Sequence, residues 1–169
     1  MSDYRDPIIM KVIAALETNG PSELVGRYHH GDLWAPNKSE LPLCYVTKDR
    51  VFVQPTTNME DENRHQLAAT LVYDYTQDLD SAYDMIAGSA GVYELVEKRN
   101  DDGTLAEDCL LYQVRRGIQL GTNMWMGIES AVEINYGLGV ERRGPGTFSV
   151  EATIRFQVVQ HLETPQGNV

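Results

Sequence analysis

The sequence predicts an α+β domain: a largely antiparallel sheet with a long C-terminal β-hairpin, packed against two helices. Three observations carry this prediction: an amphipathic helical stripe near the N-terminus, an alternating strand in mid-chain, and two strand-like runs near the C-terminus joined by a glycine-rich loop. Strands and helices do not alternate regularly, which argues against a doubly wound parallel sheet. The length of 169 residues fits one domain, which we expect over 1–163, followed by a polar, extended tail over 164–169.

The first helix is predicted directly after Asp6, a residue type that caps helices, and Pro7 occupies the favoured first helical position. The segment 19–21, Asn-Gly-Pro, should end it. The apolar residues between these signals recur at helical spacing and should form one buried stripe: Ile8, Ile9, Val12, Ile13 and Leu16.

The next hundred residues mix short extended pieces with turns. Short strands are expected at 43–47 and 51–53, separated by a polar turn at 48–50. The segment 55–64 should be an acidic loop, and it contains Glu60, Asp61 and Glu62.

From residue 67 to residue 75 the chain alternates as a half-buried strand does, and Asp78 should then cap a second helix that ends near 88–91. The pattern at 92–97 leaves helix and strand both open. A turn at 100–103, which includes Asp101 and Asp102, and a strand at 110–114 should follow.

The C-terminal third predicts a long antiparallel hairpin with one solvated face, formed by strands at 131–136 and 148–159. Its glycine-rich connecting loop carries Arg142 and Arg143. Paired arginines at a loop tip of an acidic chain suggest a contact with an acidic neighbour, and the alternative is a solvated tip.

The charge balance restricts the partners. Lys and Arg number 14 against 25 Asp and Glu, which gives a formal net charge of −11. Such a domain cannot gain the counterion-release free energy that drives ordinary nucleic-acid binding, so a sequence-specific DNA or RNA reader is not expected. Neither a membrane span nor a signal peptide is expected, and the sequence predicts a soluble protein made in the cytoplasm.

Motifs for chemistry are weak. His29, His30 and Asp32 invite a metal-site interpretation, but adjacent residues of a strand point to opposite faces and cannot easily share one ion. Cys44 and Cys109 are expected to be reduced core residues. We therefore expect no enzyme activity, no metal and no cofactor; a small metal-dependent hydrolase that uses the His29, His30 and Asp32 region is the alternative from another functional class.

Two features favour a protein contact. Met124, Trp125 and Met126 stand between Gly121 and Gly127 in an expected loop, where they either plug the core or anchor an interface. The Arg142 and Arg143 loop is the second candidate contact.

Taken together, the pattern resembles the tail-terminator (tail-completion) proteins of bacteriophages with long non-contractile tails. The resemblance rests on the early helix at 8–16, the strand at 41–46 interrupted by Pro42, the step from the strand at 67–73 into the Asp78 helix, and the C-terminal hairpin with its polar tail. It is a likeness in the order and size of elements, and it contains no short motif that identifies the family by itself.

This resemblance implies a structural virion protein of the tail and neck, whose copies form a ring, usually a hexamer. The ring would cap the head-proximal end of the tail tube, end tube polymerisation and meet the head-closure or neck proteins, with DNA passing through without specific binding. A negatively charged lumen suits that role, and its candidate residues are Glu60, Asp61, Glu62, Asp101 and Asp102. Another neck or tail protein, either a head-closure protein or a tail-tube subunit, is the alternative within this class.

Overall fold

A computed structural model describes residues 4–33, 35–75, 90–127, 131–137 and 139–165 of the chain, and over these residues the α+β prediction is confirmed. The described α-helices are α1 (Pro7–Asn19), α3 (Ala90–Glu97) and α4 (Leu110–Arg115), with short 3-10 turns at Ser22–Leu24 and Lys38–Glu40. The described strands are β1 (Tyr28–His30), β2 (Leu43–Pro55), β3 (Glu60–Asp74), β4 (Ile118–Gly121), β5 (Met124–Met126), β6 (Glu133–Tyr136), β7 (Glu141–Gly144) and β8 (Thr147–Glu163).

The strands form one sheet with the order β1-β2-β3-β8-β5-β4, in which β1 and β2 are parallel and the other pairs are antiparallel. Its centre is the long pair of β3 and β8, whose register runs without a break from Asp74 opposite Ser149 to Glu60 opposite Glu163. Along its other side β8 pairs in turn with β7, β6 and β5. The predicted pairing of 131–136 with the last long strand is therefore confirmed through β6. The predicted glycine-rich loop between them is wrong in part, because Glu141–Gly144 forms β7 and the hairpin turn lies between β7 and β8.

Helix α1 forms as predicted. The Asp6 carboxylate accepts hydrogen bonds from the backbone N–H groups of Ile8 at 2.8 Å and Ile9 at 3.3 Å, which satisfies two of the free donors at the helix start. The five apolar side chains of its predicted stripe are all buried.

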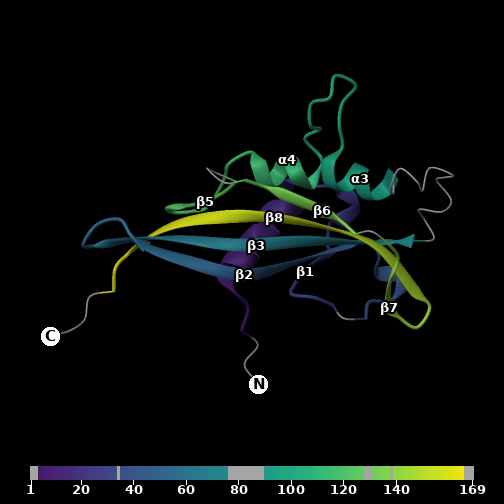
Figure 1. The fold of residues 1–169 in the computed structure, drawn as a ribbon, viewed down its shortest axis with the longest axis horizontal. Helices are drawn as coiled ribbons and strands as arrows, with labels where there is room; N and C mark the ends of the chain where they lie inside the picture. Colours follow the sequence, from purple (N-terminus) through teal and green to yellow (C-terminus); the bar gives the residue numbers. More distant parts are fainter. Residues whose placement is uncertain (1–3, 34, 76–89, 128–130, 138, 166–169) are drawn as a thin grey trace.

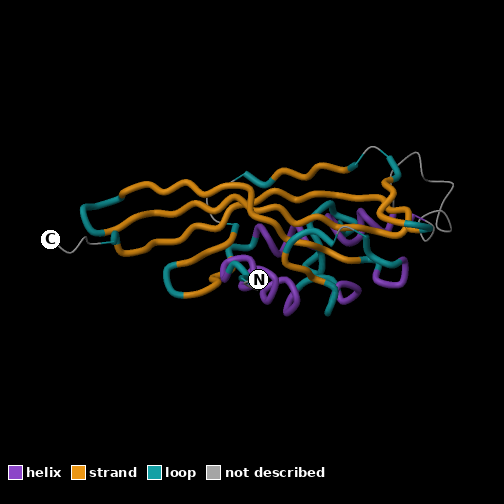
Figure 2. The backbone as a smooth tube through the Cα atoms, turned by 90° about the horizontal axis from the view of Figure 1, so that it is seen from below, coloured by secondary structure: helices purple, strands orange, loops and turns teal. Residues whose placement is uncertain are grey.

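The core lies between the helices and one face of the sheet (Figures 1 and 2). On that face Leu67 is opposite Phe156 and Ala69 is opposite Ile154, and all four are buried. The other face carries no described helix. A small second cluster of Leu41, Leu43 and Val72 covers part of it at one end of the sheet.

Two predictions about β2 and β3 need correction. The expected turn at 48–50 is instead a bulge between Lys48 and Arg50 inside one continuous β2. The expected acidic loop at 55–64 is mostly strand, because β3 begins at Glu60. The bulge absorbs the extra polar residue, so that both long strands can remain paired.

The predicted strand at 110–114 is wrong, because these residues form α4. Leu110 and Val114 are four residues apart on one helix face and both are buried, and a short apolar run does not distinguish helix from strand by its pattern. The segment 92–97, which the sequence left open, is helical in α3. The predicted turn at 100–103 is confirmed, with the Gly103 N–H donating to the Asn100 carbonyl at 2.8 Å.

The predicted helix from Asp78 falls within 76–89, outside the described residues, as do residues 166–169 of the predicted tail. No described helix is long and apolar enough to cross a membrane.

Candidate functional site

Three strands of the sheet run past the helical layer toward the turn between β2 and β3 (Figures 1 and 2). We call this part the ribbon, and it comprises residues 50–64 of β2, the turn and β3, together with residues 159–163 of β8. The register keeps the strands paired to the end, with Pro55 opposite Asp61 and Asp61 opposite Leu162.

The ribbon concentrates exposed apolar side chains. Of the nine large apolar side chains that are well exposed in the described part of the chain, five belong to it: Val51 (40% exposed), Phe52 (51%), Val53 (62%), Met59 (67%) and Leu162 (44%). Single exposed apolar residues are common on soluble proteins, but several concentrated in one part of a fold point to an interaction surface. By register, Val51, Val53 and Leu162 lie on one face of the ribbon and Phe52 on the other. The sequence carried a signal for it, the apolar triplet at 51–53, which was interpreted as an ordinary short strand.

The five acidic residues proposed for a lumen do not form one surface in a single copy. Glu60, Asp61 and Glu62 start β3 in the ribbon, whereas Asp101 and Asp102 lie in the loop that projects beyond α3 and α4 (Figure 1).

Several of these acids already have partners within the chain. Glu62 pairs with Arg64, and the Asp61 carboxylate accepts a hydrogen bond from the Thr164 hydroxyl at 3.2 Å. Asp102 accepts hydrogen bonds from the backbone N–H and the hydroxyl of Thr104, which hold the turn together and lower the pKa of Asp102.

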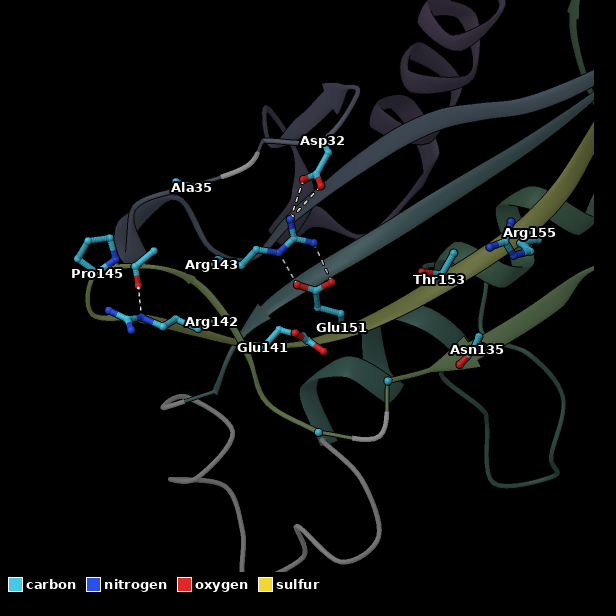
Figure 3. Close-up of a pocket in the computed structure, with 13 residues that line it drawn as sticks. Asp32, Ala35, Asn135, Glu141, Arg142, Arg143, Pro145, Glu151, Thr153 and Arg155 are labelled. Atoms are coloured by element: carbon cyan, nitrogen blue, oxygen red, sulfur yellow. Dashed lines mark hydrogen bonds and ion pairs between the residues drawn. The ribbon is translucent and has the colours of Figure 1, made fainter.

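A polar groove of about 770 Å³ lies on the side of the sheet without helices, close to the β7–β8 turn (Figure 3). Its described lining includes neither His nor Cys. It consists of Asp32, Ala35, Asn135, Gly137, Gly139, Glu141, Arg142, Arg143, Gly144, Pro145, Glu151, Thr153 and Arg155. The Thr153 hydroxyl is hydrogen-bonded to the Thr70 hydroxyl at 3.1 Å. The groove offers hydrogen bonds and charges of both signs, and its described lining pairs no nucleophile with a base.

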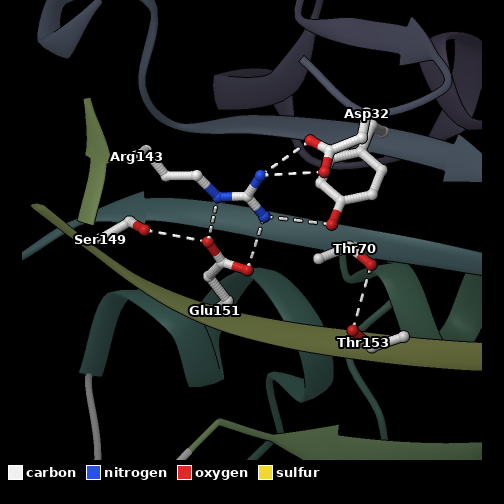
Figure 4. A network of polar contacts seen from close by, with 7 residues as sticks. Asp32, Thr70, Arg143, Ser149, Glu151 and Thr153 are labelled. Atoms are coloured by element: carbon white, nitrogen blue, oxygen red, sulfur yellow. Dashed lines mark hydrogen bonds and ion pairs between the residues drawn. The ribbon is translucent and has the colours of Figure 1, made fainter. Parts of the chain in front are cut away.

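Arg143 crosses this groove and joins three parts of the chain (Figure 4). Its guanidinium donates two hydrogen bonds to Glu151 of β8, at 2.5 and 2.8 Å, and two to Asp32, at 2.8 and 3.0 Å. A further hydrogen bond reaches the Tyr45 hydroxyl at 3.1 Å. The hydrogen bonds to Glu151 are the main reason that the pKa of Arg143 is raised, and burial opposes them.

The prediction of a projecting arginine pair is therefore wrong for Arg143, whose side chain is only 12% exposed. Arg142, its neighbour, is exposed on β7, and its Nε donates to the Gly144 carbonyl at 3.4 Å. Adjacent residues of a strand face opposite ways, so the two arginines cannot share the same partners.

The sequence Met124-Trp125-Met126 forms β5 and is not a loop. Met124 and Met126 are buried in the core. Of the two roles the sequence left open for them, the structure supports packing in the core. Trp125 points to the opposite face, half-buried, with its ring edge-to-face against His161 at a centroid distance of 6.0 Å. It is the one residue of the three that remains a candidate contact.

A second polar cluster links the start of α1 to the sheet. Lys48 pairs with Asp6, and the neighbouring buried His65 shares a hydrogen bond with the Gln160 side chain through Nε2 at 3.1 Å. Burial would raise the pKa of Asp6, but the hydrogen bonds from Lys48 and from the helix N–H groups outweigh it and lower that pKa. Burial is the main reason that the pKa of His65 lies below its usual value, and the Nδ1 of His65 has no hydrogen-bond partner in the described structure.

Two of the residues of the metal-site alternative, His30 and Asp32, serve separate contacts. His30 accepts a hydrogen bond from the backbone N–H of Asp6 at 2.9 Å, whereas the Asp32 carboxylate is bound by Arg143. Over the described ranges no three side chains of His, Cys, Asp or Glu come close enough to hold a metal ion. Cys44 and Cys109 are free and buried, and burial raises the pKa of the Cys44 thiol to about 12.

Comparison with known proteins gives no identification: no protein-family model matches the chain, and no curated protein sequence matches it significantly.

Proposed function

We propose that this chain is a structural protein of a phage tail, a tail terminator. Its copies would form a ring at the head-proximal end of the tail tube, stop tube growth and join the tail to the neck proteins. The proposal extends the resemblance in element order, and what supports it in the molecule is the ribbon, a surface built for contact with other protein.

The ribbon is suited to this task because its strands stay paired to the turn and it exposes five large apolar side chains. Its strands keep their register to the turn, so the exposed side chains of Met59 and Leu162 are held at fixed positions beyond the helices. Preorganised apolar side chains lose little conformational entropy when a partner covers them. The formal net charge of −11 suits a ring through which DNA moves without adhering.

The second candidate is another neck or tail protein, above all a tail-tube subunit, since the same ribbon could contact the next layer of a tube. The two functions differ in what the purified protein builds, because a tube subunit stacks without limit and a terminator stops as one ring.

The test is light scattering across protein concentration, with negative-stain images of the same samples, both alone and after addition of tail tubes. Closed rings of uniform size, or rings that form on tube ends and stop their growth, would support the terminator. Open-ended tubes would support the tube subunit. A chain that stays monomeric and leaves tube growth unaffected would contradict both.

A variant pair ties the function to the ribbon. Met59→Asp places a charge at the exposed ribbon turn, and we expect it to abolish attachment to tubes while the protein keeps its melting temperature. Val25→Asp is the matched control, because Val25 is 57% exposed and lies outside the ribbon. Equal attachment by the two variants would remove the ribbon from the proposal.

A further inference from the structure

Among the described residues, no strand pairs with the outer edge of β2 over the length of the ribbon. In the described structure β1 pairs with β2 only as far as Val46, and every residue from Arg50 to Pro55 is exposed. An exposed, apolar edge strand is a ready template for another strand.

The backbone direction at this edge follows from the hydrogen bonds at the ribbon turn. The Thr56 N–H donates to the Glu60 carbonyl, so the backbone groups of Glu60 point toward β2. Backbone groups alternate sides along a strand, so the backbone N–H and C=O groups of Glu62 and Arg64 also point toward β2. Their partners Gln54 and Phe52 in turn direct their backbone groups toward β3. The N–H and C=O groups of Val51 and Val53 therefore point outward, away from the sheet.

The sequence along this edge is symmetric about Phe52. It reads polar, valine, phenylalanine, valine, polar from Arg50 to Gln54. If a second copy approaches antiparallel with Phe52 at the centre, Val51 of each copy lies opposite Val53 of the other. Arg50 then lies opposite Gln54, and no like charges face each other.

The antiparallel hydrogen-bond pattern matches this register. The two Val51 and Val53 pairs become the hydrogen-bonded pairs, in which each residue donates and accepts, and the central Phe52 pair becomes the closely spaced pair that is not hydrogen-bonded. A register shifted by one residue would place outward groups opposite inward ones and lose these bonds.

We propose that this β2 edge binds the same edge of a second copy, with two-fold symmetry about Phe52, and joins two sheets into one. This contact goes beyond the proposed function, because a two-fold contact pairs copies and does not by itself close a ring.

A single cysteine tests the register. In a closely spaced antiparallel pair the Cα atoms are about 4.5 Å apart, within the roughly 4.4–6.8 Å that a disulfide spans. Phe52→Cys should therefore give a disulfide-linked dimer as the main product of mild oxidation. The native Cys44 and Cys109 are buried and should not contribute.

Gln54→Cys is the matched control, since Gln54 is also exposed on the same strand and the same face but would lie opposite Arg50. It should give little dimer. Equal cross-linking of the two variants, or none of Phe52→Cys, would overturn the proposal, even if rings form.

A second pair of variants tests the edge without a cross-link. Val53→Pro removes an outward N–H and leaves the β2–β3 hydrogen bonds in place, because proline is tolerated on an edge strand. We expect the dimer dissociation constant, measured by sedimentation, to rise roughly tenfold or more, whereas Val53→Thr, which keeps the N–H, should change it little. A wild-type chain that is monomeric at all concentrations, or an unchanged constant in Val53→Pro, would overturn the proposal.

Discussion

Arg142 and Arg143 are adjacent arginines with different roles. Arg143 is only 12% exposed and holds Asp32 and Glu151 together, whereas Arg142 is exposed. Removing one member of a largely buried ion pair leaves the other charge unpaired, and partial exposure reduces the cost. We expect Arg143→Ala to lower the free energy of unfolding by about 2 kcal/mol and Arg142→Ala to leave it nearly unchanged in urea titrations. Similar values for the two variants would show that the network contributes little.

His65 makes stability depend on pH. Its pKa in the folded chain lies below the ordinary value of 6.5, chiefly because of burial, so the unfolded chain binds the proton more readily. The stability that the folded chain gains from a neutral His65 is complete above pH 6.5. It is lost as the pH falls through the lower pKa of His65 in the folded chain. We expect the urea midpoint to fall between pH 7.5 and pH 5, and to fall less in His65→Gln. An equal loss in both proteins would assign the pH dependence to other groups.

At the scale of elements, the close approach of the end of α4 to the residue after β5 depends on Gly127. Its φ of +81° favours glycine, and a Cβ there would lie 2.0 Å from the Val114 carbonyl oxygen of α4. Gly103 has a similar φ of +85° but open space around it. Gly103→Ala should cost about 1 kcal/mol of unfolding free energy for backbone strain alone. Gly127→Ala should cost roughly 3 kcal/mol or more, because the helix must move. Thermal or urea unfolding of the two variants provides the comparison, and equal losses would show that α4 shifts freely.

The helices α1 and α4 and the bulge in β2 show how far local patterns could lead. The cap and stripe of α1 lie within one short segment, and they were enough to predict that helix. The helix α4 was predicted as a strand because six residues with two buried apolar positions fit either structure. The bulge at Lys48 and Arg50 was predicted as a turn, since a polar interruption within a strand has no local signal that distinguishes the two.

At the scale of the whole molecule, charge opposes assembly. Each copy carries a formal net charge of −11, so copies repel one another, and salt screens that repulsion over a Debye length of about 10 Å at 0.1 M and about 3 Å at 1 M. The proposed contact between copies at the β2 edge is centred on the apolar triplet at 51–53. We therefore expect self-association, measured by sedimentation, to strengthen as salt rises from roughly 0.05 to 0.5 M. Weaker association at higher salt would indicate an interface held by ion pairs.

The sequence alone determined the fold class, the first helix, the central strand from residue 67, the pairing of 133–136 with the last strand, and the acidity. These properties follow from local periodicity, capping and composition. Only the tertiary structure decided that Arg143 turns inward to Asp32, 111 residues away along the chain, and that Met124 and Met126 enter the core while Trp125 does not. It also decided that the triplet at 51–53 forms an edge that no described strand covers, because β1 pairs with β2 only as far as Val46. Contacts between distant residues and the absence of a neighbouring strand have no signature in local sequence, so the predicted site residues were the part most changed by the fold.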